Sequence, residues 1–266
     1  MKYLFYILLF GGLLLGCQTN PVTGRKSLDL VSASEMQTMS YKEYDSFIAS
    51  HKLSSNTEQA AMVTRVGTRI QKAVEAYLTE NNKSKQLEGF KWEFHLVEDP
   101  TVNAWCMPGG KVVVYTGIMP LMKNETALAV VLGHEIAHAI ANHGAERMSE
   151  GMVQKFGGVA LSVAMANKPE QTKALYAQAY NTGSQVAVML PYSRMHESEA
   201  DHMGLIFMSI AGYNPDEAVD FWKGMKAASG GKSSNDIMST HPSDDKRISD
   251  IQQWIPEVKA KYYKAK

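Results

Sequence analysis

The chain has 266 residues, enough for one domain with a substantial core or at most two small domains. Apolar residues make up 45% of the sequence and charged residues 20%, as in ordinary globular proteins. Because 27 Lys and Arg residues balance 27 Asp and Glu residues, the charge gives no reason to expect nucleic acid as a partner.

The N-terminus has the pattern of an export signal. Lys2 precedes an apolar run from Leu4 to Leu15. This run is shorter than the roughly 20 apolar residues that a membrane-spanning helix needs. We therefore expect residues 1–16 to be a signal peptide and not a membrane span.

The residues that follow resemble a lipoprotein processing site. Leu14-Leu15-Gly16-Cys17 is similar to the lipobox of bacterial lipoproteins, in which the cysteine is lipidated and becomes the new N-terminus. A plain signal peptide followed by a chance cysteine is the alternative. The resemblance implies that Cys17 is anchored in the bacterial cell envelope. Gln18, in place of Asp, favours the outer membrane, facing the periplasm, and residues 17–30 would form a lipid-anchored tether.

Caps, periodicity and turn residues predict three helices and two strands in the first half of the chain. Ser32 to Glu35 match a capping box, and the side chain of Asn124 can cap the third helix. The predicted helices cover 32–48, 56–77 and 124 onward, and the predicted strands cover 90–96 and 111–116.

The second half is predicted to be helical. The segment 144–190 is rich in Gly, Ala, Met and Gln, and its apolar run is too short to cross a membrane. We expect a buried helix or a lid there, with a membrane-touching segment as the alternative. Further helices are predicted over 193–211, from 214 onward and at the end of the domain, before a basic tail over 259–266.

The chemistry is concentrated in His134-Glu135-Ile136-Ala137-His138, within an apolar helix. Residues four apart share a helix face, so His134 and His138 can bind one metal ion. Glu135 points about 100° away, where it can contact a water on that ion without being a ligand. Zinc would lower the pKa of this water, and Glu135 would pass its proton to the leaving amine. The alternative is a structural helix, whose buried histidines and glutamate would need other partners.

A catalytic zinc site needs a third protein ligand. On a continuous helix His143 would lie about 180° from His134, so we expect it to cap or pack near the helix end. Glu197 and Asp201 share a helix face, which suits a ligand followed by a carboxylate that accepts a hydrogen bond from a ligand histidine. We therefore expect Glu197 as the third ligand and Asp201 as that acceptor. Glu199 fits this pairing worse, and a solvated acidic stretch is the alternative.

Four segments together resemble metallopeptidase family 48: "HEIAH", "ESEADHMGL", "NAWCMPGGKVVVYTG" and "THPSDDKRI". This family includes the CAAX prenyl protease and Oma-type proteases. The resemblance covers about Asn20 to Ile255 and is to bacterial members without transmembrane helices. It implies a gluzincin with one Zn²⁺ per chain. The implied fold is an α+β, mainly helical, zincin-like domain over 31–258, with a small β-sheet beside the active-site helix.

The resemblance also implies a strand that binds substrate. Asn103, Ala104 and the turn at Gly109 and Gly110 would lie at the sheet edge next to the zinc. An unfolded peptide can pair with such an edge by β-augmentation. A purely structural hairpin is the alternative.

A further histidine would approach the zinc if the resemblance holds. His241 could displace the catalytic water and keep the enzyme latent, or it could stabilise the oxyanion of the transition state. A structural role for His241 is the alternative. His202 is another candidate to face the cleft, and Arg194 and Tyr192 are further oxyanion candidates.

Three functions are compatible with these residues. The first is a lipid-anchored zinc endopeptidase that hydrolyses misfolded or unassembled envelope proteins, so its partners would be unfolded polypeptides and a membrane. The second is a chaperone or assembly factor for envelope proteins, in which His241 fills the open zinc position. The third is a structural zinc protein. Glu135 favours the enzyme, because binding alone does not require it.

Overall fold

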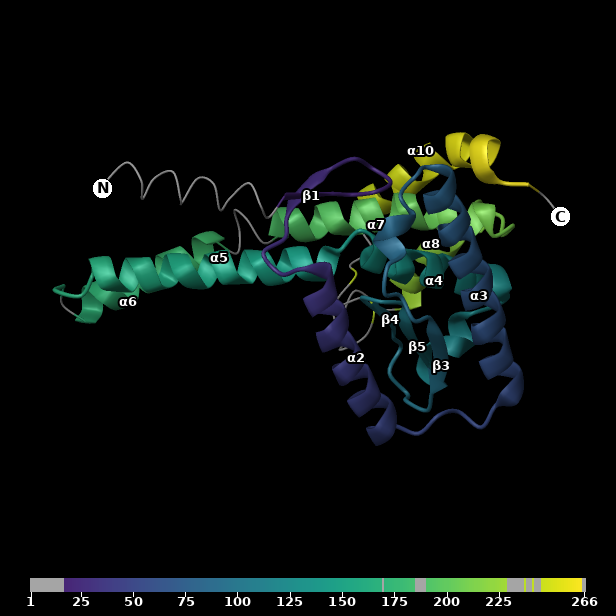
Figure 1. Cartoon of the computed structure of the whole chain (residues 1–266), viewed down its shortest axis with the longest axis horizontal. Helices are drawn as coiled ribbons and strands as arrows, with labels where there is room; N and C mark the ends of the chain where they lie inside the picture. The colour runs from purple at the N-terminus through teal and green to yellow at the C-terminus, as the bar shows by residue number, and fades with distance from the viewer. Residues whose placement is uncertain are drawn as a thin grey trace.

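The computed structural model describes residues 17–168, 170–184, 190–228, 237, 241 and 245–264. The predicted signal peptide over 1–16 lies outside the described residues. Within the described part, the helices pack with a three-stranded sheet, β3-β5-β4, and a separate two-stranded hairpin, β1-β2 (Figure 1). The α+β, mainly helical class expected from the sequence is confirmed.

The helices and strands are as follows. The helices are α2 (Ala33–Ser50), α3 (Thr57–Glu80), α4 (Glu125–Ile140), α5 (His143–Ala164), α6 (Glu170–Ser184), α7 (Leu190–Ile210), α8 (Glu217–Ala228) and α10 (Asp245–Tyr262). The strands are β1 (Cys17–Thr19), β2 (Lys26–Leu28), β3 (Glu93–Val97), β4 (Ala104–Met107) and β5 (Lys111–Tyr115). Two short 3₁₀ helices are η1 (Ser84–Leu87) and η2 (Thr116–Leu121).

Side-chain caps determine where the predicted helices begin. Ser32 and Glu35 form the complete capping box at the start of α2. Asn56 caps α3 by accepting a hydrogen bond from the backbone of Gln59. Asn124 caps α4 by accepting a hydrogen bond from the backbone N–H of Ala127 at 2.8 Å. These local hydrogen bonds confirm the predicted starts.

The sheet has β5 in the middle, paired in parallel with β3 and antiparallel with β4. Among the described residues β4 has one strand neighbour only, so its other side is an edge, and α4 lies beside it. The turn into β5 contains Gly109 and Gly110 at φ values of 87° and 85°. Glycine adopts this left-handed conformation without the steric cost that a Cβ would bring.

Helix α4 lies at the centre of the core. Every residue from Ala127 to Ile140 is buried, between α3, α7, α8 and β4. A helix that is covered on all sides must be apolar nearly throughout, and α4 is apolar except for its two histidines and its glutamates. Polar side chains on this helix therefore need partners inside the protein.

The N-terminal segment 17–30, predicted from the sequence to be a tether with turn residues, has a regular structure of its own. β1 and β2 form an antiparallel hairpin in which Cys17 pairs with Leu28. The hairpin contacts distant parts of the domain: Lys83 Nζ donates to the carbonyl of Pro21 at 2.6 Å, and the N–H of Leu30 donates to Ser149 Oγ at 2.8 Å. The segment is therefore part of the folded domain.

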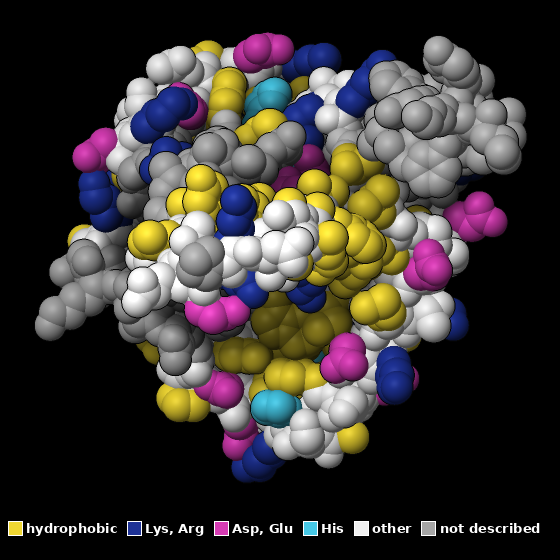
Figure 2. Space-filling model, turned by 90° about the vertical axis from the view of Figure 1, so that its left-hand side faces the viewer, with side chains coloured by type: hydrophobic (Ala, Val, Ile, Leu, Met, Phe, Trp, Pro, Cys, Tyr) yellow, Lys and Arg dark blue, Asp and Glu magenta, His cyan; other side chains and the backbone are white. Residues whose placement is uncertain are grey.

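Helices α5 and α6 form a hairpin that projects from the body (Figure 1). Only the first turns of α5 are buried, so the expectation of a buried helix in 144–190 is wrong for most of this segment. Figure 2, which looks at this end of the molecule, shows hydrophobic side chains gathered there. Six large apolar side chains of the hairpin are exposed: Val153, Phe156, Val159, Val163, Leu175 and Tyr176. Among the described residues, no helix has the length and apolar character that a bilayer span requires.

Candidate metal centre and active site

The helices that carry the two motifs touch backbone to backbone. A Cβ on Gly204 of α7 would lie 2.9 Å from the backbone nitrogen of His134, and a Cβ on Gly133 would lie 3.0 Å from the carbonyl of Gly204. Glu197, Asp201 and Gly204 have the spacing of one helix face. The close contact therefore brings both carboxylates against the histidines of α4.

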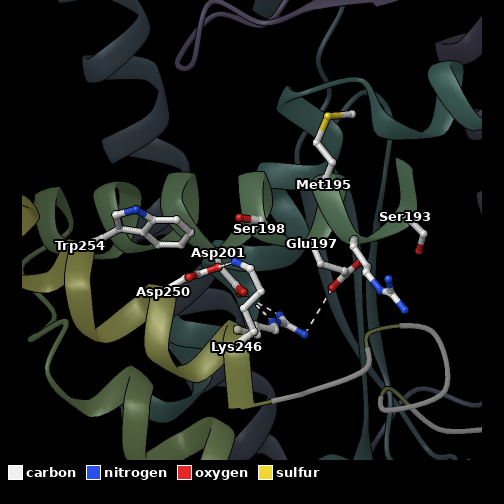
Figure 3. A pocket seen from close by; sticks show the side chains of 10 residues that line it. Ser193, Met195, Glu197, Ser198, Asp201, Lys246, Asp250 and Trp254 are labelled. Carbon is white, nitrogen blue, oxygen red and sulfur yellow. Dashed lines mark hydrogen bonds and ion pairs between the residues drawn. The ribbon is translucent and has the colours of Figure 1, made fainter. Parts of the chain in front are cut away.

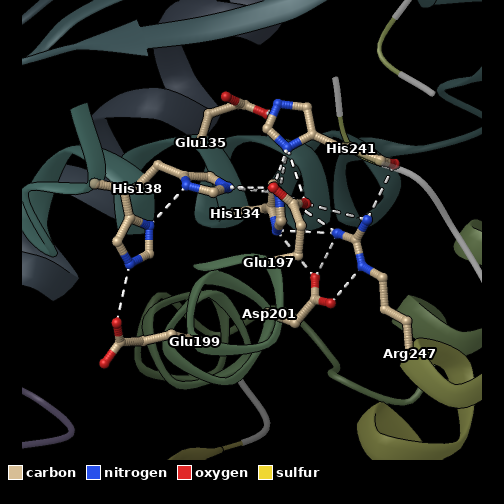
Figure 4. Close-up of polar contacts among 9 residues, drawn as sticks. His134, Glu135, His138, Glu197, Glu199, Asp201, His241 and Arg247 are labelled. Carbon is tan, nitrogen blue, oxygen red and sulfur yellow. Dashed lines mark hydrogen bonds and ion pairs between the residues drawn. The ribbon is translucent and has the colours of Figure 1, made fainter. Parts of the chain in front are cut away.

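The three predicted ligands converge on one point (Figure 4). The Nε2 atoms of His134 and His138 are 3.1 Å apart. The two carboxylate oxygens of Glu197 lie 3.3 Å from them, one from each. Ligand atoms about 2.0–2.1 Å from a tetrahedral zinc ion lie about 3.3 Å from one another. Both the spacing and the chemistry of these donors therefore fit a zinc ion.

The ionisation of two of the three ligands suits metal binding. For the third, His134, burial is outweighed by hydrogen bonds with Asp201 and Glu197, which raise its pKa to about 9, so a metal ion must displace a proton from this ring. Burial opposes the ionisation of Glu197, but hydrogen bonds with His134, His138 and His241 hold the pKa of this carboxyl far below its usual range. Burial lowers the pKa of His138 well below its usual value. An ionised Glu197 and a neutral His138 are the forms that bind zinc.

Glu135 lies beside this cluster with an incomplete set of contacts. Its side chain is buried, and its Oε1 atom has no hydrogen-bond partner within the described part of the chain. His241 Nε2 lies 3.5 Å from that atom. A buried carboxylate oxygen without a hydrogen bond is costly unless water or substrate completes it. This is the environment expected of a general base.

Asp201 contacts the nitrogen of His134 that faces away from the other ligands, as predicted. The Nδ1–H of His134 donates to Asp201 Oδ1 at 2.9 Å, which leaves Nε2 for the metal. Arg247 of α10, which the sequence did not single out, donates to both oxygens of Asp201 and reaches Glu197 Oε2 at 3.3 Å. Its guanidinium carbon lies 3.8 Å above the centre of the Trp222 ring. Arg247 was contained in the segment "THPSDDKRI", but nothing local indicated its partner.

His143 and Glu199 hold His138, a role that the sequence analysis gave to neither residue. Asn142 has a left-handed φ of 59°, so α4 ends and the chain reverses before His143. The Nδ1 atoms of His143 and His138 are consequently 2.8 Å apart, and His143 Nε2 lies 2.9 Å from Glu199 Oε2. His143 therefore does not lie on a continuation of α4 opposite His134, but at the start of a new helix, α5.

The hydrogen bonds to His143 determine which nitrogen of His138 faces the metal. Burial lowers the pKa of His143 to about 4, so its ring is neutral near pH 7. Burial opposes the ionisation of Glu199, but hydrogen bonds from His143, Arg25 and Thr23 lower its pKa to about 2, so it can only accept. His143 must then donate from Nε2 and accept at Nδ1. His138 therefore donates from Nδ1 and keeps the Nε2 lone pair for the metal.

His241 joins the ligand cluster as a fourth residue. Its Nδ1 atom lies 2.9 Å from Glu197 Oε2 and 3.1 Å from His134 Nε2. Its ligand atom and those of His134, His138 and Glu197 all lie within 4.8 Å of one another. Its backbone N–H donates to the carbonyl of Ile237 at 2.7 Å, and Ile237 is fully buried. Core packing therefore positions this histidine at the site.

The remaining candidates for the cleft have different surroundings. Arg194 is exposed and lines a cavity of about 480 Å³ beside Glu197 and Asp201 (Figure 3). His202 lies against Trp254 of α10, with ring centres 4.9 Å apart, so it does not join the ligand cluster. The side chain of Tyr192 lies outside the described residues.

The residues predicted to form a substrate-binding strand edge also differ in their surroundings. The carbonyl of Asn103 accepts from the N–H of Tyr115 at 3.0 Å, inside the sheet. Because backbone groups alternate along an antiparallel strand, those of Ala104 point to the free edge. The carbonyl of Val102, next on that edge, accepts from the N–H of Ile237 at 2.8 Å. Ile237 thus covers part of this edge.

The turn at Gly109 and Gly110 serves the opposite side of the sheet. The carbonyl of Gly109 accepts from the N–H of Lys91 at 2.8 Å, and that of Gly110 accepts from the N–H of Glu93 at 3.0 Å. These contacts join the turn to β3. The structure therefore leaves Ala104 buried on the outer side of β4, which packs against α4, with its N–H donating to Asn103 Oδ1 at 2.9 Å. It gives the two glycines a role in the sheet itself.

Comparisons with known proteins agree with this site. The family model described as Peptidase family M48 matches residues 65–255. The chain is 37% identical to the mitochondrial metalloendopeptidase OMA1 of Schizosaccharomyces pombe, over 91% of this chain and 67% of the relative. It is 31% identical to the mitochondrial metalloendopeptidase OMA1 of Homo sapiens, over 91% of this chain and 46% of the relative.

A bacterial relative is also similar, over a shorter stretch. The chain is 28% identical to the Beta-barrel assembly-enhancing protease of Escherichia coli, over 60% of this chain and 34% of the relative. The relatives are thus mitochondrial as well as bacterial, and the chain spans about half the length of the human protein. With the cluster of histidines and glutamate that would bind the metal, these matches show that the chain belongs to peptidase family M48 and is a metalloendopeptidase.

Proposed function

We propose that the protein is a zinc endopeptidase in which His134, His138 and Glu197 hold the ion and Glu135 is the general base. The observation that carries this proposal is the convergence of three ligand atoms at zinc spacing beside a buried carboxylate without a full set of hydrogen bonds. When bound, zinc supplies a water of lowered pKa and polarises the scissile carbonyl. Glu135 takes a proton from the water and delivers it to the leaving amine.

The chain's own residues prepare this reaction. Asp201 and Glu199, the latter through His143, fix the orientation of the two histidine rings, so the Nε2 atoms need not reorganise when the metal binds. Burial excludes bulk water from the carboxylates. In this proposal the backbone carbonyl of Ala104, on the outer side of β4, would accept a hydrogen bond from an extended peptide, which favours unfolded substrates.

His241 acts as a latch in this proposal. The Nδ1 atom of His241 lies close enough to the ligand atoms of the other three residues to share a metal ion with them. It would then occupy the metal position that the catalytic water needs. Ile237, whose carbonyl accepts from the N–H of His241, donates to the carbonyl of Val102. If Ile237 and His241 moved together, they would free both a metal position and a strand position. To stabilise the oxyanion, His241 would have to contact the substrate and not be a metal ligand. Its position among the ligands therefore favours the role of a latch.

The substrates we propose are misfolded or unassembled proteins of the bacterial cell envelope. The similarity to a Beta-barrel assembly-enhancing protease supports this location, as does the lipobox-like sequence before Cys17. Lipidation at Cys17 would hold the domain at the outer membrane, facing the periplasm. Replacing Cys17 by Ser should then abolish incorporation of labelled palmitate and move the protein to the soluble envelope fraction. Unchanged labelling would contradict the anchor.

A second candidate function is supported by the projecting hairpin. The exposed apolar side chains of α5 and α6 could bind unfolded clients, and His241 supplies a fourth ligand that closes the metal cluster. A latent zinc chaperone or assembly factor for envelope proteins would have both features. It would bind zinc and clients but would not need Glu135.

The decisive experiment compares the wild type with Glu135→Gln and His241→Ala, measuring zinc content and cleavage of casein as an unfolded substrate. We expect about one zinc per chain in all three. Glu135→Gln should lose between about 10²- and 10⁴-fold of the activity, as expected for a general base. His241→Ala should cleave faster than the wild type, whereas slower cleavage would assign it a catalytic role. Zinc binding without cleavage by any form would favour the chaperone.

A further inference from the structure

We propose that the N-terminal hairpin of β1 and β2 acts as a positioning device for the metal ligand His138. Arg25 of this hairpin would fix Glu199, which fixes His143, which orients His138. The inference rests on the proposed zinc site. It assigns a role in metal retention to a segment that lies more than 100 residues from the ligand in sequence.

The contacts form an unbroken series. From the metal side, His138 meets His143 through their Nδ1 atoms at 2.8 Å, and His143 Nε2 meets Glu199 Oε2 at 2.9 Å. Arg25 then donates to the same oxygen of Glu199 from Nε at 2.9 Å and from Nη2 at 2.8 Å. The hydroxyl of Thr23 donates to the other oxygen of Glu199. Both oxygens of this carboxylate are thus held by the hairpin.

Arg25 also connects the two helices that carry this series. It binds Glu146 of α5 with two parallel hydrogen bonds, Nη1 to Oε1 at 2.8 Å and Nη2 to Oε2 at 2.7 Å. His196 Nε2 of α7 lies 3.0 Å from Glu146 Oε2, and the rings of His143 and His196 are stacked with centres 4.2 Å apart. A planar guanidinium can make this fork geometry to two carboxylates, which an ammonium group cannot.

The partners of Arg25 are buried, so water cannot easily take the place of its guanidinium. Glu146 and His143 are 2% and 0% exposed, and Glu199 is 7% exposed. Removing one partner of a buried ion pair leaves an uncompensated charge, and the structure then rearranges to hydrate it. Such a rearrangement would move Glu199. His143 would move with it, because His143 Nε2 is in hydrogen-bond contact with Glu199. The effect would reach His138 without a change in the ligand itself.

The hairpin is built to hold Arg25 in one place. Asn20 organises the turn before Arg25: its Oδ1 accepts from the N–H of Val22 at 2.8 Å, and its N–H donates to the carbonyl of Arg25 at 2.7 Å. The side chain of Asn20 is buried, and Lys83 holds the carbonyl of Pro21. The guanidinium is therefore presented from an ordered turn that is docked on the domain.

The test uses Arg25→Gln, Arg25→Lys and the matched control Arg65→Gln in the full chain. Arg65 also binds a glutamate, Glu125, from a neighbouring helix, but more than half of its side chain is exposed and it lies outside the metal cluster. The readouts are the rate of zinc loss to a chromogenic chelator and the visible absorption of the Co²⁺-substituted protein. Thermal unfolding of the metal-free protein reports folding separately.

We expect Arg25→Gln to release zinc about 10–100-fold faster and to alter the Co²⁺ spectrum, as loss of outer hydrogen bonds to a ligand does. Arg25→Lys should lie between it and the wild type, and Arg65→Gln should match the wild type. Wild-type rates of zinc loss in a folded Arg25→Gln protein would overturn the proposal. If Arg25→Gln does not fold, Thr23→Val, which removes one hydrogen bond to Glu199, should still release zinc faster. A wild type that binds no zinc would instead refute the metal centre itself.

Discussion

His134 and His138 lie one turn apart on α4, yet opposite ends of the chain hold them in place. Asp201 contacts His134 directly and is neutralised by Arg247, which comes from the C-terminal helix. His138 is held through two side chains, and the cation at the end of that series comes from the N-terminal hairpin. The first arrangement is compact and lies in the core, whereas the second is longer and ends near the surface.

Because of this difference, we expect the two arrangements to contribute differently to the stability of the fold and to metal binding. An interaction made directly with a ligand in the core should matter both for folding and for the metal. An interaction made through intermediates near the surface should matter more for the metal than for folding. Variants on the two sides can therefore separate the two effects.

The largest effect is expected for Asp201→Ala. This change leaves Arg247 buried without its main partner and removes the hydrogen bond that orients His134. We expect the free energy of unfolding of the metal-free protein to fall by about 3–5 kcal/mol, measured by urea denaturation. Asp216→Ala is the control, because the pair of Asp216 with Lys259 is solvent-exposed, and its loss should cost less than about 1 kcal/mol. Equal losses in the two variants would contradict the expected difference.

Gly204→Ala tests the helix contact on which both arrangements depend. The added methyl group would lie 2.9 Å from the backbone of His134, so α4 and α7 must move apart. We expect a loss of about 1–3 kcal/mol in stability, together with weaker zinc binding. Gly224→Ala in α8 is the control, since nothing lies within 4 Å of its added Cβ, and it should stabilise the helix slightly. A Gly204→Ala protein with unchanged stability and zinc affinity would show that the helices tolerate the separation.

Much of this site could be predicted because the relevant patterns are local. The caps at Ser32 and Asn124 join residues three apart, and the pairs His134–His138 and Glu197–Asp201 each repeat at one helical turn. The family resemblance added the third ligand and the fold, and the structure brings those residues together.

The unpredicted residues have partners that are far away in sequence. Arg247 binds Asp201 from 46 residues away, and Arg25 binds Glu199 from 174 residues away. No periodicity or spacing indicates such pairs. His143 was missed for a local reason: the left-handed Asn142 interrupts the helix, so the angle calculated for a continuous helix did not apply. An asparagine followed by a new polar segment was the signal that could have suggested this break.

A smaller effect is expected for Glu199→Gln, on the longer arrangement. The amide keeps the shape of the side chain. It removes the negative charge of the carboxylate that pairs with Arg25 and accepts a hydrogen bond from His143. We expect zinc release to become about tenfold faster, with a smaller loss of stability than in Asp201→Ala. Glu98→Gln removes a surface ion pair with Lys52 at 2.7 Å and should leave zinc release unchanged. If Glu199→Gln destabilises folding as strongly as Asp201→Ala, the two arrangements are equivalent and the comparison fails.

The smallest effect concerns Asp29, which is 7% exposed and belongs to the hairpin side. Burial, and the negative charge of Glu146, raise the pKa of this carboxyl to about 6. Between its ordinary value near 4 and this raised value, the folded protein binds more protons than the unfolded chain does. Stability therefore falls as the pH rises through this range, and the loss is complete above the folded pKa.

Asp29→Asn removes this pH-dependent loss. We expect the Tm of the variant to exceed that of the wild type by a few degrees at pH 7.5, and the two values to converge near pH 4, where Asp29 is neutral in the folded protein. Thermal unfolding at a series of pH values measures both points. A difference in Tm that is the same at pH 4 and pH 7.5 would mean that packing, and not charge, limits this position. A gain confined to neutral pH would show instead that the hairpin side holds more buried negative charge than Arg25 alone can balance.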